Sequence, residues 1–138
     1  KMEVEIHVEE EILEQQIIKL VLQPVVENAI YHGIKYKDGK GLIKITGVHR
    51  SGCINLTVYD NGKGMEPEVL EHIFEPKTGH KSKSGIGISN VQMRLQLYYG
   101  KEYGLTIDSF PGQGTLIDIA LPYGKKPALP CTEQNKTE

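Results

Sequence analysis

The stretch from Asp60 to Met65 places one acid and two glycines directly after an apolar strand pattern. Residues 53–59 alternate between apolar and polar side chains, which predicts a half-buried strand. Such a strand would present the Asp60 carboxylate at its end, and Gly62 and Gly64 would allow positive φ and a ligand lying close to the backbone. The same Asp-Asn-Gly sequence also makes a good hairpin turn, so these residues alone leave a ligand site and a plain turn both open.

A second polar group lies within a predicted helix. Glu27, Asn28, Tyr31 and His32 follow one another at spacings of three and four, so they share one side of that helix. The ordinary interpretation is the solvated face of an amphipathic helix. A carboxylate beside an amide next to an apolar stretch also suggests a site, because both groups need partners when they are half buried.

A third candidate is Gly85-Ile86-Gly87, which precedes a helix predicted over residues 89–99. A helix N-terminus presents free N–H groups at the positive end of its dipole, where a phosphate binds well. The preceding residues, 75–84, carry three lysines and show no apolar periodicity. That composition fits either a mobile lid or an exposed linker.

The remaining patterns predict the elements that hold these residues. Pro24 lies inside the first predicted helix, so we expect a kink or restart near residues 20–23. On the last helix, Val91, Leu95 and Tyr98 should form an apolar stripe that Arg94 and Leu97 widen. The predicted strands cover residues 2–8, 42–50, 53–59, 103–110 and 115–121, and the predicted helices cover residues 12–34, 67–74 and 89–99. The economical packing is α+β, a two-layer α/β sandwich whose mixed, mostly antiparallel sheet carries its helices on one face.

Length and composition bound the function. The 138 residues have a formal net charge of −2, and neither sign is segregated, so no nucleic-acid footprint is indicated. One domain over residues 1–122 accounts for the apolar content, and residues 123–138 have little to bury, which predicts a disordered tail or linker. Lys1 is not a natural start, so we expect a fragment of a longer protein with any membrane or sensory segment upstream.

The cysteines and histidines indicate neither a disulfide scaffold nor a metal site. Cys53 begins a predicted core strand and Cys131 lies in the polar tail, a pair that suits thiols in a reducing cytosol better than a disulfide scaffold. The five histidines have no metal-ligand spacing with one another or with cysteine, so zinc is not expected.

Four segments in order resemble the N, G1, G2 and G3 boxes of the GHKL superfamily of ATP-binding domains. They are Val-Glu-Asn-Ala-Ile-Tyr-His-Gly (26–33), Asp-Asn-Gly-Lys-Gly-Met (60–65), Gly-Ile-Gly-Ile (85–88) and Gly-Gln-Gly-Thr (112–115). Leu-Gln-Pro-Val-Val-Glu-Asn (22–28) and Asn-Val-Gln-Met-Arg-Leu (90–95) are similar to the LytS/YesM-type sensor histidine kinases in particular. The resemblance covers residues 1–122.

This resemblance implies a Bergerat-fold catalytic domain that binds ATP and Mg²⁺. Asn28 would ligate the Mg²⁺, Glu27 would orient or activate near it, and Asp60 would accept a hydrogen bond from the adenine amine. The other implied nucleotide contacts are Gly62, Gly64 and Met65 of the G1 box, Gly85, Ile86 and Gly87 of the G2 box, and Thr115. Phosphoryl transfer asks mainly for such positioning and for neutralisation of charge.

Two features depart from the family pattern. Many histidine kinases carry a basic residue three positions after the N-box asparagine, where this chain has Tyr31. His32 or Lys35 would then contact the phosphates instead. The lid is short, and the phenylalanine box is reduced to Ile73-Phe74.

The resemblance also implies partners. The γ-phosphoryl would pass to a histidine on an upstream dimerisation domain that this chain lacks, so the chain alone should not autophosphorylate. A response-regulator receiver domain would take it next, and the full kinase would be a membrane-anchored homodimer with this domain in the cytoplasm. Three alternatives stay open: a GHKL ATPase that uses Glu27 as a general base on water, an anti-sigma-type serine kinase, and a non-catalytic module that has lost the nucleotide.

Overall fold

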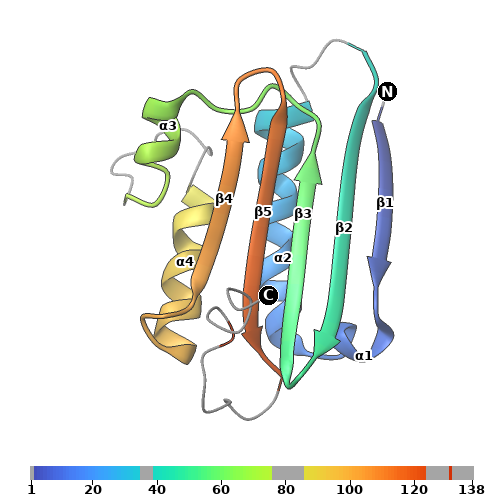
Figure 1. Cartoon of the computed structure of the whole chain (residues 1–138), viewed down its shortest axis with the longest axis vertical. Helices are drawn as coiled ribbons and strands as arrows, with labels where there is room; N and C mark the ends of the chain where they lie inside the picture. The colour runs from blue at the N-terminus through green and yellow to red at the C-terminus, as the bar shows by residue number, and fades with distance from the viewer. Residues whose placement is uncertain (1, 35–38, 76–85, 124–130, 132–138) are drawn as a thin grey trace.

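The computed structural model describes residues 2–34, 39–75, 86–123 and 131. One five-stranded sheet forms the front layer in Figure 1, and the helices lie behind it. The strands are β1 (Met2–Val8), β2 (Gly41–Arg50), β3 (Cys53–Asp60), β4 (Gly104–Phe110) and β5 (Gly114–Pro122). The helices are α1 (Glu10–Leu13), α2 (Gln16–Asn28), the π-helix η1 (Ala29–Ile34), α3 (Pro67–Glu71) and α4 (Ile86–Tyr99).

The sheet runs in the order β1-β2-β3-β5-β4. β1 pairs with β2 in parallel, and the other three pairings are antiparallel. Ser51 (φ 56°) and Gly52 (φ 77°) make the tight turn between β2 and β3. The predicted two-layer α+β fold with a mixed, mostly antiparallel sheet is therefore confirmed.

β3 and β5 carry the centre of the core. Ile54, Leu56 and Val58 are each at most 1% exposed, and they face the helices because side chains alternate along a strand. Ile43 and Ile45 of β2 and Ile117 and Ile119 of β5 complete that layer. Of the helices in the described ranges, none has the length and apolarity needed to cross a membrane.

The predicted restart of the helix at Pro24 does not occur, because α2 continues through it from Gln16 to Asn28. The break lies earlier, between α1 and α2. Pro24 has no N–H, so it cannot donate to the Leu20 carbonyl one turn back. Arg94 of α4 takes that place, because its Nη1 donates to Leu20 O at 3.4 Å. The neighbouring helix thus satisfies the carbonyl that proline leaves free.

The last helix begins earlier than predicted, and the predicted apolar stripe is buried at Val91 and Leu95 but not at its C-terminal end. α4 starts at Ile86, and its buried stripe is Ile88, Val91 and Leu95. Leu97 is 78% exposed because it lies on the other side of the helix from Val91. Tyr98 is 66% exposed at the end of the helix. Its ring and the Tyr99 ring pack in a T-shaped arrangement with a centroid distance of 5.9 Å.

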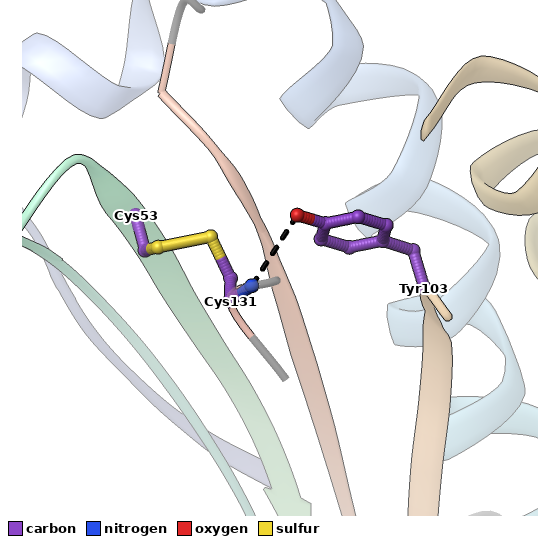
Figure 2. The surroundings of a disulfide bond; sticks show 3 residues. All are labelled: Cys53, Tyr103 and Cys131. Atoms are coloured by element: carbon purple, nitrogen blue, oxygen red, sulfur yellow. Dashed lines mark hydrogen bonds between the residues drawn. A yellow bond between two sulfur atoms is a disulfide. The ribbon is translucent and has the colours of Figure 1, made fainter. Parts of the chain in front are cut away.

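The expectation of two unpaired thiols is also wrong. Cys53 and Cys131 form a disulfide bond across a sequence separation of 78 residues, as Figure 2 shows. Both are buried, at 3% and 1% exposure, together with Tyr103 and Ala120. Cys131 lies in the segment predicted as a tail, and composition alone gave no sign that this one position packs against β3.

The buried Leu56 and the exposed Leu97 offer a test of where the core lies. Leu56→Ala should lower the free energy of unfolding by about 2–5 kcal/mol, because it leaves a cavity beneath the central strand. Leu97→Ala makes the same chemical change on an exposed surface and should cost less than about 0.5 kcal/mol. Urea unfolding measures both values. Equal losses would contradict the burial described here.

Candidate functional site

Three buried polar side chains lie in a row at one end of the sheet. Asp60 ends β3, its register partner on β5 is Thr115, and the partner of Thr115 on β4 is Ser109. They are 3%, 5% and 6% exposed, and they are the buried polar or charged residues of the described part of the chain. All three face the helix layer, in line with the apolar residues of their strands.

The Asp60 carboxylate has little to stabilise its charge. Gly62 N donates to Oδ1 at 2.9 Å, and within the described residues this is the hydrogen bond that the carboxylate receives. Burial raises the pKa of Asp60 from 3.8 to about 6, and the Gly62 hydrogen bond lowers it only in part. A buried acceptor with spare lone pairs is suited to bind an N–H donor from a ligand.

The residues after Asp60 do not form a hairpin turn. Asn61 instead fastens the end of β3 to the start of β2: Leu42 N donates to Asn61 Oδ1 at 2.8 Å, and Asn61 N donates to Leu42 O at 3.1 Å. The chain then runs on to α3 rather than to a paired strand. This arrangement excludes the plain hairpin interpretation, and the ligand site stays a prediction.

The G1 loop is held against the β4–β5 turn by close backbone contact. Gly64 has φ +73°, and a Cβ there would lie 2.0 Å from the carbonyl oxygen of Phe110. Gly112 N donates to Lys63 O at 2.6 Å. A Cβ on Gly114 would lie 2.1 Å from Asp60 O. Gly64 is therefore required by the packing of the protein on itself, whatever a bound base needs.

Ser109 is a site residue that the sequence analysis missed. Its hydroxyl accepts a hydrogen bond from Met65 N at 2.9 Å, donates to Gly114 O at 3.1 Å and lies 2.8 Å from Thr115 Oγ1. One side chain thus joins the G1 loop, the β4–β5 turn and the G3 threonine. A serine among alternating residues of a strand carries no signal of its own, because the contact depends on which loop packs above it.

The N-box residues lie at the end of α2. Asn28 is half-buried, whereas Glu27 is exposed and accepts a hydrogen bond from Gln23 Nε2 at 3.2 Å. From Ala29 the chain continues as the π-helix η1, whose i→i+5 bonds widen the turn. The α-helical spacing therefore changes from Ala29 onward, and the grouping of Tyr31 and His32 with Asn28 stays a prediction. π-Helical turns are frequent at functional sites.

The G2 residues pack on the N-box helix. A Cβ on Gly87, in the first turn of α4, would lie 3.2 Å from Pro24 Cβ. A side chain at this position would push α4 away from α2. Ile86 and His32 enter as backbone positions of α4 and η1, while Lys35, Gly85 and residues 76–84 of the expected lid lie outside the described residues.

The four boxes therefore gather at one end of the molecule. Figure 1 shows the end of α2, the end of β3, the start of β5 and the start of α4 toward the same end, with α3 beside them. A hollow of about 740 Å³ lined by described residues lies elsewhere, between the end of α4 and the start of β4. Tyr103, Gln96 and Thr106 line it, and none of the boxes does.

Residues 14–125 match the profile of the family of histidine kinase-, DNA gyrase B- and HSP90-like ATPases. The chain belongs to this family. It is 37% identical to the sensor histidine kinase YesM of Bacillus subtilis over 115 residues, which are 83% of this chain and 18% of that protein. It is 32% identical to the sensor protein LytS of Bacillus anthracis over 122 residues, which are 88% of this chain and 21% of that protein. The chain thus spans about one fifth of the length of these relatives.

Solved structures show the same ATPase-family fold. The histidine kinase domain of the blue-light activated kinase from Erythrobacter litoralis superposes with a TM-score of 0.64 at 20% identity, covering 88% of this chain and 52% of that one. The catalytic domain of histidine kinase ThkA, in a nucleotide-free form, gives 0.63 at 24% identity, covering 88% and 79%. The predicted membership of the superfamily, and its LytS/YesM-type branch, is confirmed.

The raised pKa of Asp60 predicts a pH dependence of stability. Between pH 3.8 and about 6, the folded domain holds the Asp60 proton more tightly than the unfolded chain. The protonated Asp60 carboxyl group therefore contributes fully to the free energy of unfolding below pH 3.8. This contribution is lost as pH rises through about 6, a change of up to roughly 3 kcal/mol. Asp60→Asn cannot titrate, so its free energy of unfolding should lack this fall.

Urea unfolding of the wild type and Asp60→Asn at a series of pH values measures this difference. Glu68→Gln, which removes an exposed carboxyl group from α3, serves as the control. Parallel profiles for the wild type and Asp60→Asn would mean that the Asp60 carboxylate is not destabilised by its surroundings.

The contacts of Ser109 predict a second effect. Ser109→Ala leaves the Met65 N–H without its acceptor, so it should lower the free energy of unfolding by about 1–3 kcal/mol. Hydrogen exchange at the Met65 amide should accelerate as well. Thr106→Ala, on an exposed position of the same strand, should cost less than about 0.5 kcal/mol. Unchanged exchange at Met65 would show that Ser109 does not hold the loop.

Proposed function

We propose that this domain binds ATP with Mg²⁺ and is the catalytic domain of a longer sensor histidine kinase. The observation that carries the proposal is the buried Asp60 carboxylate, which receives one hydrogen bond among the described residues. It lies beside Thr115 at the end of the sheet where the four boxes gather. Membership of an ATPase family and the similarity to sensor kinases support it.

Asp60 would select adenine over guanine. The exocyclic amine of adenine is an N–H donor, which a buried carboxylate binds well. Guanine carries a carbonyl oxygen at the same place, and an acceptor facing a buried acceptor is repelled. Thr115 and the G1 loop, including Gly62, Gly64 and Met65, would hold the base in position. Ser109 positions that loop from beneath.

The phosphates and the metal would bind between α2 and α4. Asn28 offers a half-buried amide oxygen for Mg²⁺, with Glu27 orienting groups nearby. No group of three or more His, Cys, Asp or Glu residues that could hold a metal occurs in the described ranges. Mg²⁺ usually takes one or two protein oxygens together with substrate phosphates, whose charge it would neutralise here. Gly85, Ile86 and Gly87 would contact the phosphates at the start of α4, and His32 or Lys35 would add a cation.

The phosphoryl acceptor would be a histidine of a dimerisation domain in the same kinase. Of this chain's histidines, His7 and His49 lie on strands and His72 follows α3, and none of these three is in a helical hairpin. We also propose, from the resemblance to sensor kinases, that the chain alone does not autophosphorylate. A receiver domain would take the phosphoryl group next, and the full protein would be a membrane-anchored homodimer that keeps this domain, 1–122, on the cytoplasmic side.

Calorimetric titration of ATP and GTP, each with Mg²⁺, tests the adenine pocket. ATP should bind and GTP should not. Asp60→Asn should weaken ATP binding about 10- to 100-fold, because a hydrogen bond to a charged acceptor is worth about 1.5–3 kcal/mol.

Asp108→Asn is the matched control, since it makes the same change on an exposed position of β4 and should keep wild-type affinity. Binding of ATP and GTP with equal affinity, or full ATP affinity in Asp60→Asn, would refute the assignment of Asp60. Failure of both nucleotides to bind the correctly folded wild type would favour a module that has lost the nucleotide.

A further inference from the structure

The disulfide lies on the face of the sheet that the helices leave open. Cys53 and Ala120 alternate with Ile54 and Leu121, which belong to the main core, so they face away from the helix layer. A residue on an uncovered sheet face should meet water, yet Cys53 is 3% exposed and Ala120 is 7% exposed. Cys131 provides cover for them, as part of a second small cluster separate from the main core.

The cluster also holds the backbone of Cys131. Its N–H donates to the Tyr103 hydroxyl at 3.3 Å, and Figure 2 shows this bond beside the disulfide. The Tyr103 ring is itself 2% exposed and packs against Tyr99 at a centroid distance of 5.6 Å. Cys131 is thus held in place by the disulfide bond, by the hydrogen bond from its N–H and by apolar contact.

The attachment is remote from the nucleotide site. Cys53 and Asp60 are the two ends of β3, about 23 Å apart at a rise of about 3.3 Å per residue. An ATP-binding domain works where ATP and thiol reductants occur together, and there disulfides are usually transient. This step rests on the proposed function, whereas the geometry of the cysteine pair does not.

We propose that Cys53 and Cys131 are a reversible thiol–disulfide pair that fastens Cys131 to the open face of the sheet under oxidising conditions. The bond raises the stability of the domain and leaves its nucleotide affinity unchanged. Reduction frees Cys131 and uncovers Cys53 and Ala120 on the open face.

The oxidation balances with a small disulfide as the oxidant. The thiolate of one cysteine attacks a sulfur of oxidised glutathione, which gives a mixed disulfide and releases one thiol. The thiolate of the other cysteine attacks the protein-side sulfur, forms the Cys53–Cys131 bond and releases the second thiol. The protein loses two electrons and two protons, which the glutathione disulfide takes up. Because Cys53 and Cys131 are both buried, the reverse reaction requires local opening that exposes one of the two sulfurs.

The first test equilibrates the full 138-residue chain in glutathione buffers of graded oxidation. Alkylation then traps the remaining thiols, and mass spectrometry counts them. We expect one transition, without intermediates that persist, between a dithiol and an intramolecular disulfide. A pair that stays fully reduced in excess oxidised glutathione, or a disulfide that forms only between two chains, would overturn the proposal.

The second test compares the oxidised and reduced wild type by thermal unfolding. The Tm of the reduced form should be at least about 5 °C lower, because the bond closes a long loop in the unfolded chain. The double variant Cys53→Ala with Cys131→Ala should give one Tm in both buffers. An equal Tm for the two forms of the wild type would overturn the stabilising role.

Nucleotide titration completes the design. Oxidised and reduced wild type should bind ATP with affinities within about twofold, since distant sites act independently. A larger difference would overturn the claim that the attachment leaves the nucleotide site unchanged. The redox and thermal measurements use no nucleotide, so they give an answer even if the adenine pocket fails its own test.

Discussion

The burial of the Asp60 carboxylate at the end of β3 is the constraint on which the site depends. The strand is buried in the core through Ile54, Leu56 and Val58. Because side chains alternate along a strand, Asp60 faces the same helix layer as these residues. The core thus offsets the cost of taking a carboxylate out of water. Apolar packing holds the carboxylate in place, and it receives one hydrogen bond from the described residues. Its remaining lone pairs can therefore accept a hydrogen bond from a ligand.

A second constraint links the two helices. Pro24 leaves the Leu20 carbonyl without its usual donor, and the Arg94 guanidinium of α4 supplies one. Pro24 itself lies one turn after Leu20 on α2, and the missing side chain of Gly87 lets α4 approach it closely. What would be a defect in an isolated helix is therefore the point where α2 and α4 meet. Because Asn28 lies at the end of one helix and Gly87 at the start of the other, this junction sets the separation of two of the four boxes.

The strands and the fold class were predictable because their signal is local. Alternation over eight residues identifies β3 whatever surrounds it, and the order of the four boxes identified the superfamily. The continuity of α2 through Pro24, the contacts of Ser109 and the burial of Cys131 all depend on a partner distant in sequence, and no local pattern carries that information. The π-helix η1 was not predictable either, since the apolar spacing indicated one α-helix that continues to residue 34.

β3 gives its two ends different physical roles. At the Asp60 end, ligand affinity depends on the folded geometry of a few atoms, which the G1 loop and the β4–β5 turn fix by backbone contact. At the Cys53 end, the disulfide closes a loop that contains the G1, G2 and G3 boxes, and in the chain-entropy account such a bond acts mainly on the unfolded state. A constraint on the unfolded chain changes how often the domain opens without moving Asp60 relative to Thr115. If Asp60 binds the base as proposed, stability and nucleotide affinity are separable in this domain, although one strand carries the residues that would govern both.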